Sequence, residues 1–250
     1  MKYGWLPDVG DIRDFSYQAP RSILRKLPQS VDLRNSNMPL IWDQGDLGSC
    51  TAHAIGAAFE YQERQEQAED FVPSRLFIYY NERKMEGTVN SDSGAMIRDG
   101  IKSLNIYGTC PEDMWPYDIP KFRNKPTTKC YQIAQRHQAM SYSRVARLLT
   151  QMKGCLSDGY PFVFGFSVYE SFESRSVAKT GMVPMPKTGE QQLGGHAVMA
   201  CGYNDNTARF LVRNSWGPKW GQSGYFWMPY GYLLNPDLSD DFWTVRLVEK

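Results

Sequence analysis

The chain has 250 residues, of which 42% are hydrophobic and 22% are charged. This composition supports one sizeable domain or two small lobes around a real core, and it excludes an intrinsically disordered chain. The formal net charge is +1, from 28 basic and 27 acidic residues, so no field of one sign favours nucleic acid or an anionic membrane as a partner. The longest strongly apolar run, residues 161–169, is far shorter than the ~18 residues that a membrane-spanning helix needs.

The first 27 residues are rich in aromatic and charged side chains, and they contain no apolar signal-peptide run. The chain as written is therefore expected to be made in the cytosol, and export stays open because a signal could have been removed. Trp5, Phe15 and Tyr17 would be costly to leave in water. We therefore expect residues 1–27 to fold against the main body rather than to act as a linker.

The first half of the main body predicts helices. After an extended entry at residues 27–34 and a glycine-bearing turn at residues 43–48, Ser49 is a candidate N-cap for a helix with apolar residues at helical spacing. This helix is expected to fade within the charged stretch 60–70. The proline-rich residues 108–126 predict a loop and a lobe boundary. Further helices are expected after Pro73, near residues 94–104 and near residues 145–156.

The second half of the chain predicts short strands separated by glycine-rich turns. The strands are expected at residues 161–169, 195–203, 209–214, 224–228 and 244–248. Helices first and strands later predict an α+β chain with two lobes. We expect a mainly helical lobe over residues 28–140, a mainly β lobe over residues 141–250, and a functional site in the cleft between them.

Three polar residues at the ends of predicted elements form a candidate nucleophilic set. Cys50 begins the first helix, where the positive end of the helix dipole stabilises a thiolate. His196 follows two glycines at the start of a predicted strand, a suitable position for a base that faces a cleft. Asn214 ends an apolar strand, and its amide oxygen could hold the imidazole in the required tautomer, with Trp216 shielding that hydrogen bond. Each residue alone has an ordinary structural interpretation, but together they favour catalysis.

The order and spacing of these residues resemble the papain family of cysteine peptidases. The matching pieces are Gln44…Cys50, Gly195-His196-Ala197 and Asn214-Ser215-Trp216-Gly217. Cys50 and His196 are about 146 positions apart, within the range of about 130–150 that is typical of this family. The similarity extends from about residue 28 to residue 248, which is nearly the whole chain.

The resemblance implies a papain-like two-lobe fold with the active site between the lobes, and hydrolysis of peptide bonds in peptide or protein substrates. Cys50 and His196 would act as a thiolate–imidazolium pair that forms a thioester acyl-enzyme. The Gln44 side chain and the Cys50 backbone N–H would form the oxyanion hole. Gly94 and Trp216 are the candidate substrate-binding residues. No metal or organic cofactor is implied, and neither nucleic acid nor a membrane is expected as a partner.

The chain also departs from the family pattern. Leu47 stands where the family usually has a disulfide cysteine, which fits a reducing compartment or a divergent branch, and Thr51 replaces the usual aromatic residue after the nucleophile. With five cysteines, at least one lacks a partner in the chain. We expect most of them to be reduced, while a bridge between Cys110 and Cys130 stays open. The resemblance also implies a lowered pKa for the Cys50 thiol.

Residues 1–27 resemble the short leader of a bacterial branch of papain-like peptidases, in place of the large inhibitory prosegment. Two roles stay open for them: they lie in or near their own cleft, as in a zymogen, or they form a structural arm that never meets Cys50. His53 is a second candidate base on the helix of Cys50, and we rank it below His196 because it would approach the thiol from the same wall. The alternative functions are a non-catalytic papain-fold binding protein and a Cys-dependent acyltransferase.

Overall fold

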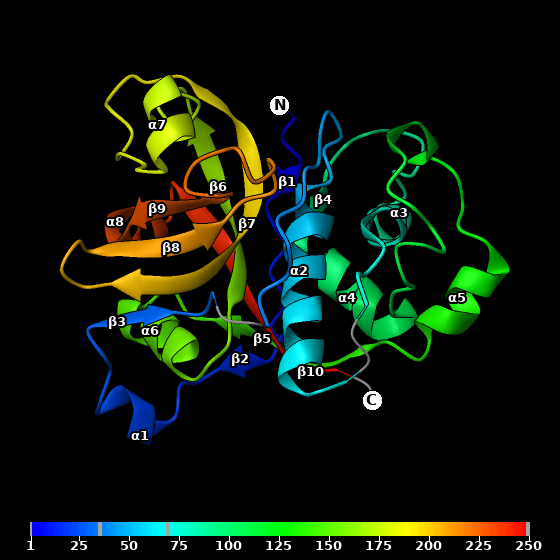
Figure 1. The fold of residues 1–250 in the computed structure, drawn as a ribbon, viewed down its shortest axis with the longest axis horizontal. Helices are drawn as coiled ribbons and strands as arrows, with labels where there is room; N and C mark the ends of the chain where they lie inside the picture. The colour runs from blue at the N-terminus through cyan, green and yellow to red at the C-terminus, as the bar shows by residue number, and fades with distance from the viewer. Residues whose placement is uncertain (1, 35–36, 69–70, 249–250) are drawn as a thin grey trace.

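The computed structural model describes residues 2–34, 37–68 and 71–248. The chain folds into a helical lobe and a strand-rich lobe, which meet along helix α2 (Cys50–Gln65) (Figure 1). The N-terminal residues, dark blue in Figure 1, run between α2 and strand β7 (Gln192–Asn204). In the part of the chain that the structure describes, no helix is long and apolar enough to cross a membrane.

The helical lobe is centred on α2. Its other elements are α3 (Arg75–Met85), α4 (Ile97–Tyr107), the 3₁₀ helix η1 (Ile119–Lys121) and α5 (Thr128–Ala134). Every residue of α2 from Cys50 to Glu63 is buried, as expected of a helix that is enclosed by other elements on all sides. The apolar side chains that predicted this helix, among them Ile55 and Phe59, are fully buried. The first residue of α2 is thereby held rigidly at the junction of the lobes.

The second lobe is built on an eight-stranded sheet in which seven strands follow the order β2-β5-β10-β6-β7-β8-β9 and β3 pairs with β7. Its later elements are β5 (Ala139–Val145), α6 (Leu149–Ser157), β6 (Phe162–Tyr169), α7 (Arg175–Thr180), β8 (Arg209–Arg213), β9 (Tyr225–Pro229), α8 (Tyr230–Leu234) and β10 (Ser239–Val248). Strand β6 pairs antiparallel with β7, and this register places His196 opposite Phe166. The apolar run of β6 is buried almost throughout, because both faces of this central strand are covered.

The N-terminal segment contributes short elements to both lobes. They are β1 (Trp5–Leu6), β2 (Ser16–Tyr17) and α1 (Arg21–Leu24), and β3 (Ser30–Asp32) follows. Strand β1 pairs in parallel with β4 (Ala95–Met96), directly before α4. Strand β2 instead pairs in parallel with β5 at the edge of the large sheet. The segment contacts both lobes through these strands. Trp5 and Tyr17 are buried as expected, whereas Phe15 is exposed, so the expectation that Phe15 packs against the main body is wrong.

The expected α+β architecture with two lobes is confirmed, and the first helix begins directly after Ser49. That helix ends at Gln65, within the stretch 60–70 where its end was expected. Residues 69–70 of that stretch lie outside the described residues. The helix expected near residues 145–156 begins only at Leu149, because Val145 belongs to β5, which pairs with β10. The divisions expected after residues 27 and 140 stay predictions.

Candidate active site

Cys50 is the first residue of α2, and its side chain is fully buried. The backbone N–H of Ala197, on β7, donates to the Cys50 sulfur at 3.4 Å. The backbone N–H of Gly4 also lies within hydrogen-bonding reach of this sulfur. Burial raises the pKa of the Cys50 thiol to about 12, although these N–H groups oppose the rise. In this arrangement the sulfur is a thiol, so the lowered pKa implied by the sequence is not observed.

His196 and Asn214 form a hydrogen-bonded pair on the opposite wall. The Nε2 atom of His196 lies 2.8 Å from Asn214 Oδ1, and the backbone N–H of Ser215 donates to the same oxygen at 2.9 Å. Because an amide oxygen can only accept, Nε2 carries the imidazole proton and Nδ1 keeps its lone pair. Nδ1 is buried and has no hydrogen-bond partner among the described residues. The histidine is thereby held in the tautomer that can accept a proton at Nδ1.

The surroundings of His196 are apolar. Its ring stacks on Trp216 with a centroid separation of 5.0 Å and an interplanar angle of 29°, and Phe166 contacts it edge-on at 5.7 Å. Burial lowers the pKa of His196 to about 4, while the hydrogen bond to Asn214 opposes this shift. The imidazole is therefore neutral at pH 7, and Trp216 stacks on it, while the role of Trp216 in shielding the hydrogen bond to Asn214 stays a prediction.

Gln44 is fully buried, and both ends of its side-chain amide are assigned by their partners. The Ser215 hydroxyl donates to Oε1 at 2.7 Å, and the two carbonyl partners of the other end identify that end as the nitrogen, because a carbonyl oxygen can only accept. Nε2 donates to the carbonyl oxygens of Leu47 and Lys2, each at 3.0 Å. One amide proton of Gln44 is thus held by its own loop, and the other points to the N-terminal segment.

The papain family cysteine protease model matches residues 27–235. The chain therefore belongs to the papain family of cysteine peptidases. An uncharacterized peptidase C1-like protein of Acanthamoeba polyphaga mimivirus is 49% identical over 215 residues, which cover 82% of this chain and 69% of that protein. The crystal structure of xylellain, a cysteine protease from Xylella fastidiosa, is 47% identical with a TM-score of 0.93, covering 99% of this chain and 96% of that one.

A more distant neighbour, procathepsin B from Trypanosoma congolense, shares the fold at 18% identity and a TM-score of 0.75, over 91% of this chain and 80% of that one. The papain-like two-lobe fold and the assignment as a cysteine peptidase are confirmed by these matches. They do not favour a non-catalytic binding protein or an acyltransferase.

In this peptidase the N-terminal segment lies between the two walls of the site. The Gly4 N–H donates to the Gly195 carbonyl oxygen at 3.1 Å, and the Gly4 carbonyl oxygen accepts from the Ala95 N–H at 2.8 Å. A Cβ atom added to Gly4 would lie 1.8 Å from the Gly48 carbonyl oxygen, and one added to Gly94 would lie 2.2 Å from the Gly4 carbonyl oxygen. Gly94 therefore faces the backbone of Gly4, and the sequence predicted that it faces the backbone of a substrate. Its role toward a substrate stays a prediction.

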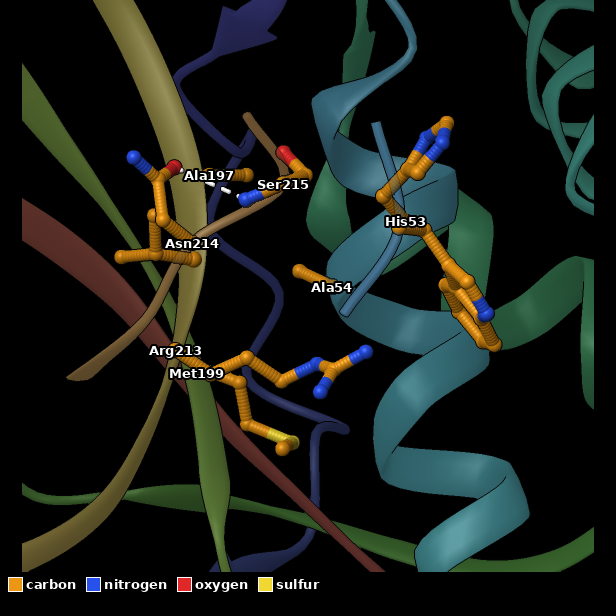
Figure 2. A pocket seen from close by; sticks show the side chains of 9 residues that line it. His53, Ala54, Ala197, Met199, Arg213, Asn214 and Ser215 are labelled. Atoms are coloured by element: carbon orange, nitrogen blue, oxygen red, sulfur yellow. Dashed lines mark hydrogen bonds between the residues drawn. The ribbon is translucent and has the colours of Figure 1, made fainter. Parts of the chain in front are cut away.

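His53 lies on the same helix as Cys50 but is engaged elsewhere. Its Nδ1 atom is 2.9 Å from the Ser49 carbonyl oxygen, so Nδ1 carries the proton, since a carbonyl can only accept. Burial, with Arg75 and Arg213 nearby, lowers the pKa of His53 to about 3. Figure 2 shows a small pocket between the lobes, with His53 on the α2 side and Asn214 and Ser215 on the strand side. His53 Nδ1 is thus engaged by the Ser49 carbonyl, while His53 Nε2 is buried without a hydrogen-bond partner among the described residues, and the choice between His196 and His53 as base stays a prediction.

The remaining thiols form no disulfides. All five cysteines are free and buried, so the Cys110–Cys130 bridge that the sequence left open is not formed. No group of three or more His, Cys, Asp or Glu residues within the described ranges is arranged to hold a metal ion.

Sequence reasoning missed two residues at this site. Ser215 follows Asn214 directly and orients Gln44, and Tyr117 contacts the residues around Cys50 from a distant loop. Ser215 belongs to the motif Asn214-Ser215-Trp216-Gly217, so its place next to Asn214 could have indicated a role at the site. Tyr117 carried no signal for this contact, because it approaches the site through the fold alone.

Proposed function

We propose that the chain is a cysteine endopeptidase in which Cys50 is the nucleophile, His196 the base and Asn214 the residue that orients the base. The observation that carries this assignment is the Nε2–Oδ1 contact of 2.8 Å between His196 and Asn214. It leaves the lone pair of Nδ1 available on the wall that faces α2. Cys50 stands at the helix N-terminus on the other wall, where a thiolate is favoured once water reaches it.

In the proposed reaction the Cys50 thiol transfers its proton to His196 Nδ1, and the sulfur attacks the scissile carbonyl carbon. The developing oxyanion is stabilised by the Gln44 Nε2–H and the Cys50 backbone N–H, and one such donor typically contributes about 2.7–4 kcal/mol. His196 then protonates the leaving amine and later activates the water that hydrolyses the thioester. Gly94 would receive the substrate backbone, and Trp216 would border the site next to His196.

We further propose that residues 2–6 restrain the peptidase by lying in its own cleft. The Lys2 carbonyl accepts from Gln44 Nε2 at 3.0 Å, the position proposed for the oxyanion donor. Gly4 is held by backbone hydrogen bonds between Gly195 and Ala95, much as an extended peptide substrate would be. Cys50 is fully buried beneath this segment. These contacts are incompatible with a substrate at the same place.

The same burial accounts for the neutral state of the reactive pair. Forming a thiolate and an imidazolium in a dry site is unfavourable, because both ions lose their hydration. The pKa of Cys50 is accordingly raised and that of His196 lowered. Displacement of residues 2–6 would readmit water and allow the ion pair to form. The segment would therefore block both the substrate and the charge separation that the reaction needs.

A cluster of ion pairs anchors the chain directly after this cleft segment. Arg98 of α4 binds Asp14 at 3.0 Å and donates its backbone N–H to Asp8 at 3.0 Å. Arg144 of β5 binds Asp8 at 3.0 Å, Asp14 at 3.1 Å and Asp241 at 3.4 Å. Because α4 and β5 belong to different lobes, the anchor fixes the path of the segment relative to both walls of the cleft.

The test uses the full chain and a Gly4→Ala variant, each with and without Cys50→Ala, assayed with a fluorogenic peptide library and an epoxide thiol trap. We expect turnover and Cys50 labelling in the Gly4→Ala chain and neither when Cys50 is replaced. Peptide turnover that survives Cys50→Ala in a folded chain would exclude Cys50 as the nucleophile. Labelling of Cys50 without any peptide turnover would instead favour an acyltransferase.

The choice of base is tested by His196→Ala and His53→Ala in the same Gly4→Ala chain. We expect His196→Ala to lower kcat by at least about 10³-fold, since removal of one member of a nucleophile–base set is typically this severe. His53→Ala should lose much less. Equal losses of kcat in two variants that retain the circular dichroism spectrum of the parent would contradict the assignment.

A further inference from the structure

The peptide bond between Ser49 and Cys50 carries the backbone N–H proposed for the oxyanion hole at one end and the Ser49 carbonyl at the other. That carbonyl oxygen accepts from His53 twice: from the backbone N–H at 3.1 Å and from Nδ1–H at 2.9 Å. Only the first of these is the ordinary helical hydrogen bond. The second comes from the His53 side chain. It further fixes the orientation of the Ser49–Cys50 peptide plane, and therefore the direction of the Cys50 N–H.

The Ser49 side chain continues this connection to Tyr117. Ser49 Oγ lies 2.6 Å from the Tyr117 hydroxyl, which donates to the backbone carbonyl oxygen of Gln44 at 2.9 Å. Because the single phenolic proton is used on Gln44, the Ser49 hydroxyl must be the donor toward Tyr117. Ser49 is the N-cap residue of α2, yet its side chain makes no cap hydrogen bond. The hydroxyl serves this connection instead.

Tyr117 is itself fixed from several sides. Its backbone N–H donates to Glu112 Oε1 at 2.7 Å, and Glu112 is paired with Arg75 at 2.5 Å. The Tyr117 ring contacts His53 edge-on at 4.9 Å between centroids, and the Arg75 guanidinium lies 5.1 Å from the ring centroid. A loop residue with these contacts can hold its hydroxyl at one position relative to Gln44 and Ser49.

We propose that Tyr117 is a positioning residue that, through Ser49 and His53, holds the two oxyanion donors of the peptidase in register. The inference rests on the proposed function, because it takes Gln44 Nε2–H and the Cys50 N–H as those donors. Ser215 already orients the Gln44 amide from the β lobe. Tyr117 fixes the backbone of Gln44 relative to the peptide bond before Cys50. A catalytic oxyanion hole depends on such preorganisation, because its donors must not move during the reaction.

The relay stays in one protonation state over the range in which a peptidase is assayed. Burial keeps the pKa of His53 at about 3, so its ring remains neutral and Nδ1–H remains a donor to the Ser49 carbonyl. Loss of the Tyr117 hydroxyl should therefore reduce the rate without moving the pH profile. That pattern separates an altered oxyanion hole from an altered nucleophile or base.

The experiment compares Tyr117→Phe with Tyr131→Phe in the full-length Gly4→Ala chain. Tyr131 is a matched control, because its hydroxyl donates to Asn81 Oδ1 at 2.8 Å elsewhere in the helical lobe. We expect Tyr117→Phe to lower kcat and kcat/KM for a peptide by the same factor, about tenfold. Equal losses in both constants are typical when a variant weakens an interaction that is made only in the transition state. The rate of Cys50 alkylation by iodoacetamide should stay within about twofold, because that displacement forms no oxyanion. Tyr131→Phe should change neither.

A second variant, Ser49→Ala, removes the middle of the relay while both aromatic rings stay in place. It should lower kcat about as much as Tyr117→Phe, and the double variant should lose little more than either single variant, since both act through one connection. Additive losses, unchanged turnover in Tyr117→Phe, or a parallel fall of alkylation and turnover would each overturn the inference. Absence of both turnover and labelling in the Gly4→Ala parent would instead overturn the proposed function and the inference with it.

Discussion

The two ends of the N-terminal segment make contacts of different kinds. Residues 2–6 lie between the walls of the site, where Gly4 is held by backbone groups and Trp5 is buried against Gly165 and donates to Asp241. Residues 16–24 belong to the β lobe: β2 extends the large sheet at β5, and the Tyr17 side chain is buried in the core of that lobe. Ala19 packs so closely on α6 that a Cβ atom added to Gly154 would lie 2.5 Å from the Ala19 Cβ.

The contacts of Gly4 are ones that a substrate could replace, whereas Trp5 and Tyr17 are buried side chains that the fold requires. Backbone contacts in a cleft can be exchanged for those of a substrate, whereas a buried tyrosine and a paired edge strand cannot be removed without exposing apolar surface. Restraint of the cleft and support of a lobe are therefore separate questions for residues 2–6 and residues 16–24. A truncation near residue 27 would remove both parts and could not distinguish them.

The largest effect is expected from Tyr17→Ala. Loss of this buried ring should lower the free energy of unfolding by about 3 kcal/mol, the lower end of the range for large aromatic-to-alanine changes. The measurement is urea denaturation, and Cys50 alkylation under native conditions should stay as slow as in the parent chain. Fast alkylation in the folded Tyr17→Ala variant would contradict the division between the two ends, because it would couple β2 to the cleft.

Gly4→Ala is expected to have the next largest effect, on the cleft rather than on the fold. The added Cβ would overlap the Gly48 carbonyl oxygen at 1.8 Å, and overpacking of this kind typically costs about 1–3 kcal/mol. Cys50 alkylation should accelerate about 10- to 100-fold, and the free energy of unfolding measured in urea should fall by no more than this cost. Gly10→Ala is the matched control, because a Cβ atom there meets nothing within 4 Å. Equal alkylation rates in the two variants would show that residues 2–6 do not restrain the nucleophile.

The pH dependence of alkylation gives a third comparison. Burial raises the pKa of Cys50 to about 12 in the closed arrangement, so the rate for the full chain should keep rising from pH 6 to pH 10. In Gly4→Ala, hydration and His196 should stabilise the thiolate, and the rate should level off at lower pH. The raised thiol pKa makes docking of residues 2–6 weaken as pH rises through the pKa of the exposed thiol. The lowered pKa of His196 makes docking weaken as pH falls below the pKa of the exposed imidazole, so docking is most favourable between these limits. Superimposable profiles would indicate that the segment does not control the protonation of Cys50.

The smallest effect is expected from Tyr3→Phe. The Tyr3 hydroxyl donates to Glu173, and its ring lies 6.3 Å from that of His196 and 6.4 Å from that of Trp216. Removing one partly exposed hydrogen bond typically costs about 0.5–1.5 kcal/mol, so Cys50 alkylation should rise about two- to tenfold while the aromatic contacts remain. Slower alkylation in this variant would mean that the hydroxyl opposes docking.

Much of the site could be anticipated from local patterns, and the missed parts share one property. Cys50 follows a helix-start signal, and Asn214 directly follows an apolar strand, so short stretches of sequence were sufficient to place them. Strand β5 was missed, because its partner β10 lies about 100 positions further along the chain. Tyr117 was missed for the same reason, since its contacts to Gln44 and Ser49 span about 70 positions.

The sequence by itself determined the family and the order and spacing of Cys50, His196 and Asn214, the residues proposed as nucleophile, base and orienting amide, together with the helix and strands that carry them. Only the tertiary structure decided where residues 2–6 lie, because β1 is a two-residue strand and no periodic pattern can predict the partner of so short an element. It also decided the burial that raises the pKa of Cys50 and lowers that of His196. The pKa values of Cys50 and His196 depend on water access, which is a property of the packed cleft and not of any local stretch of sequence.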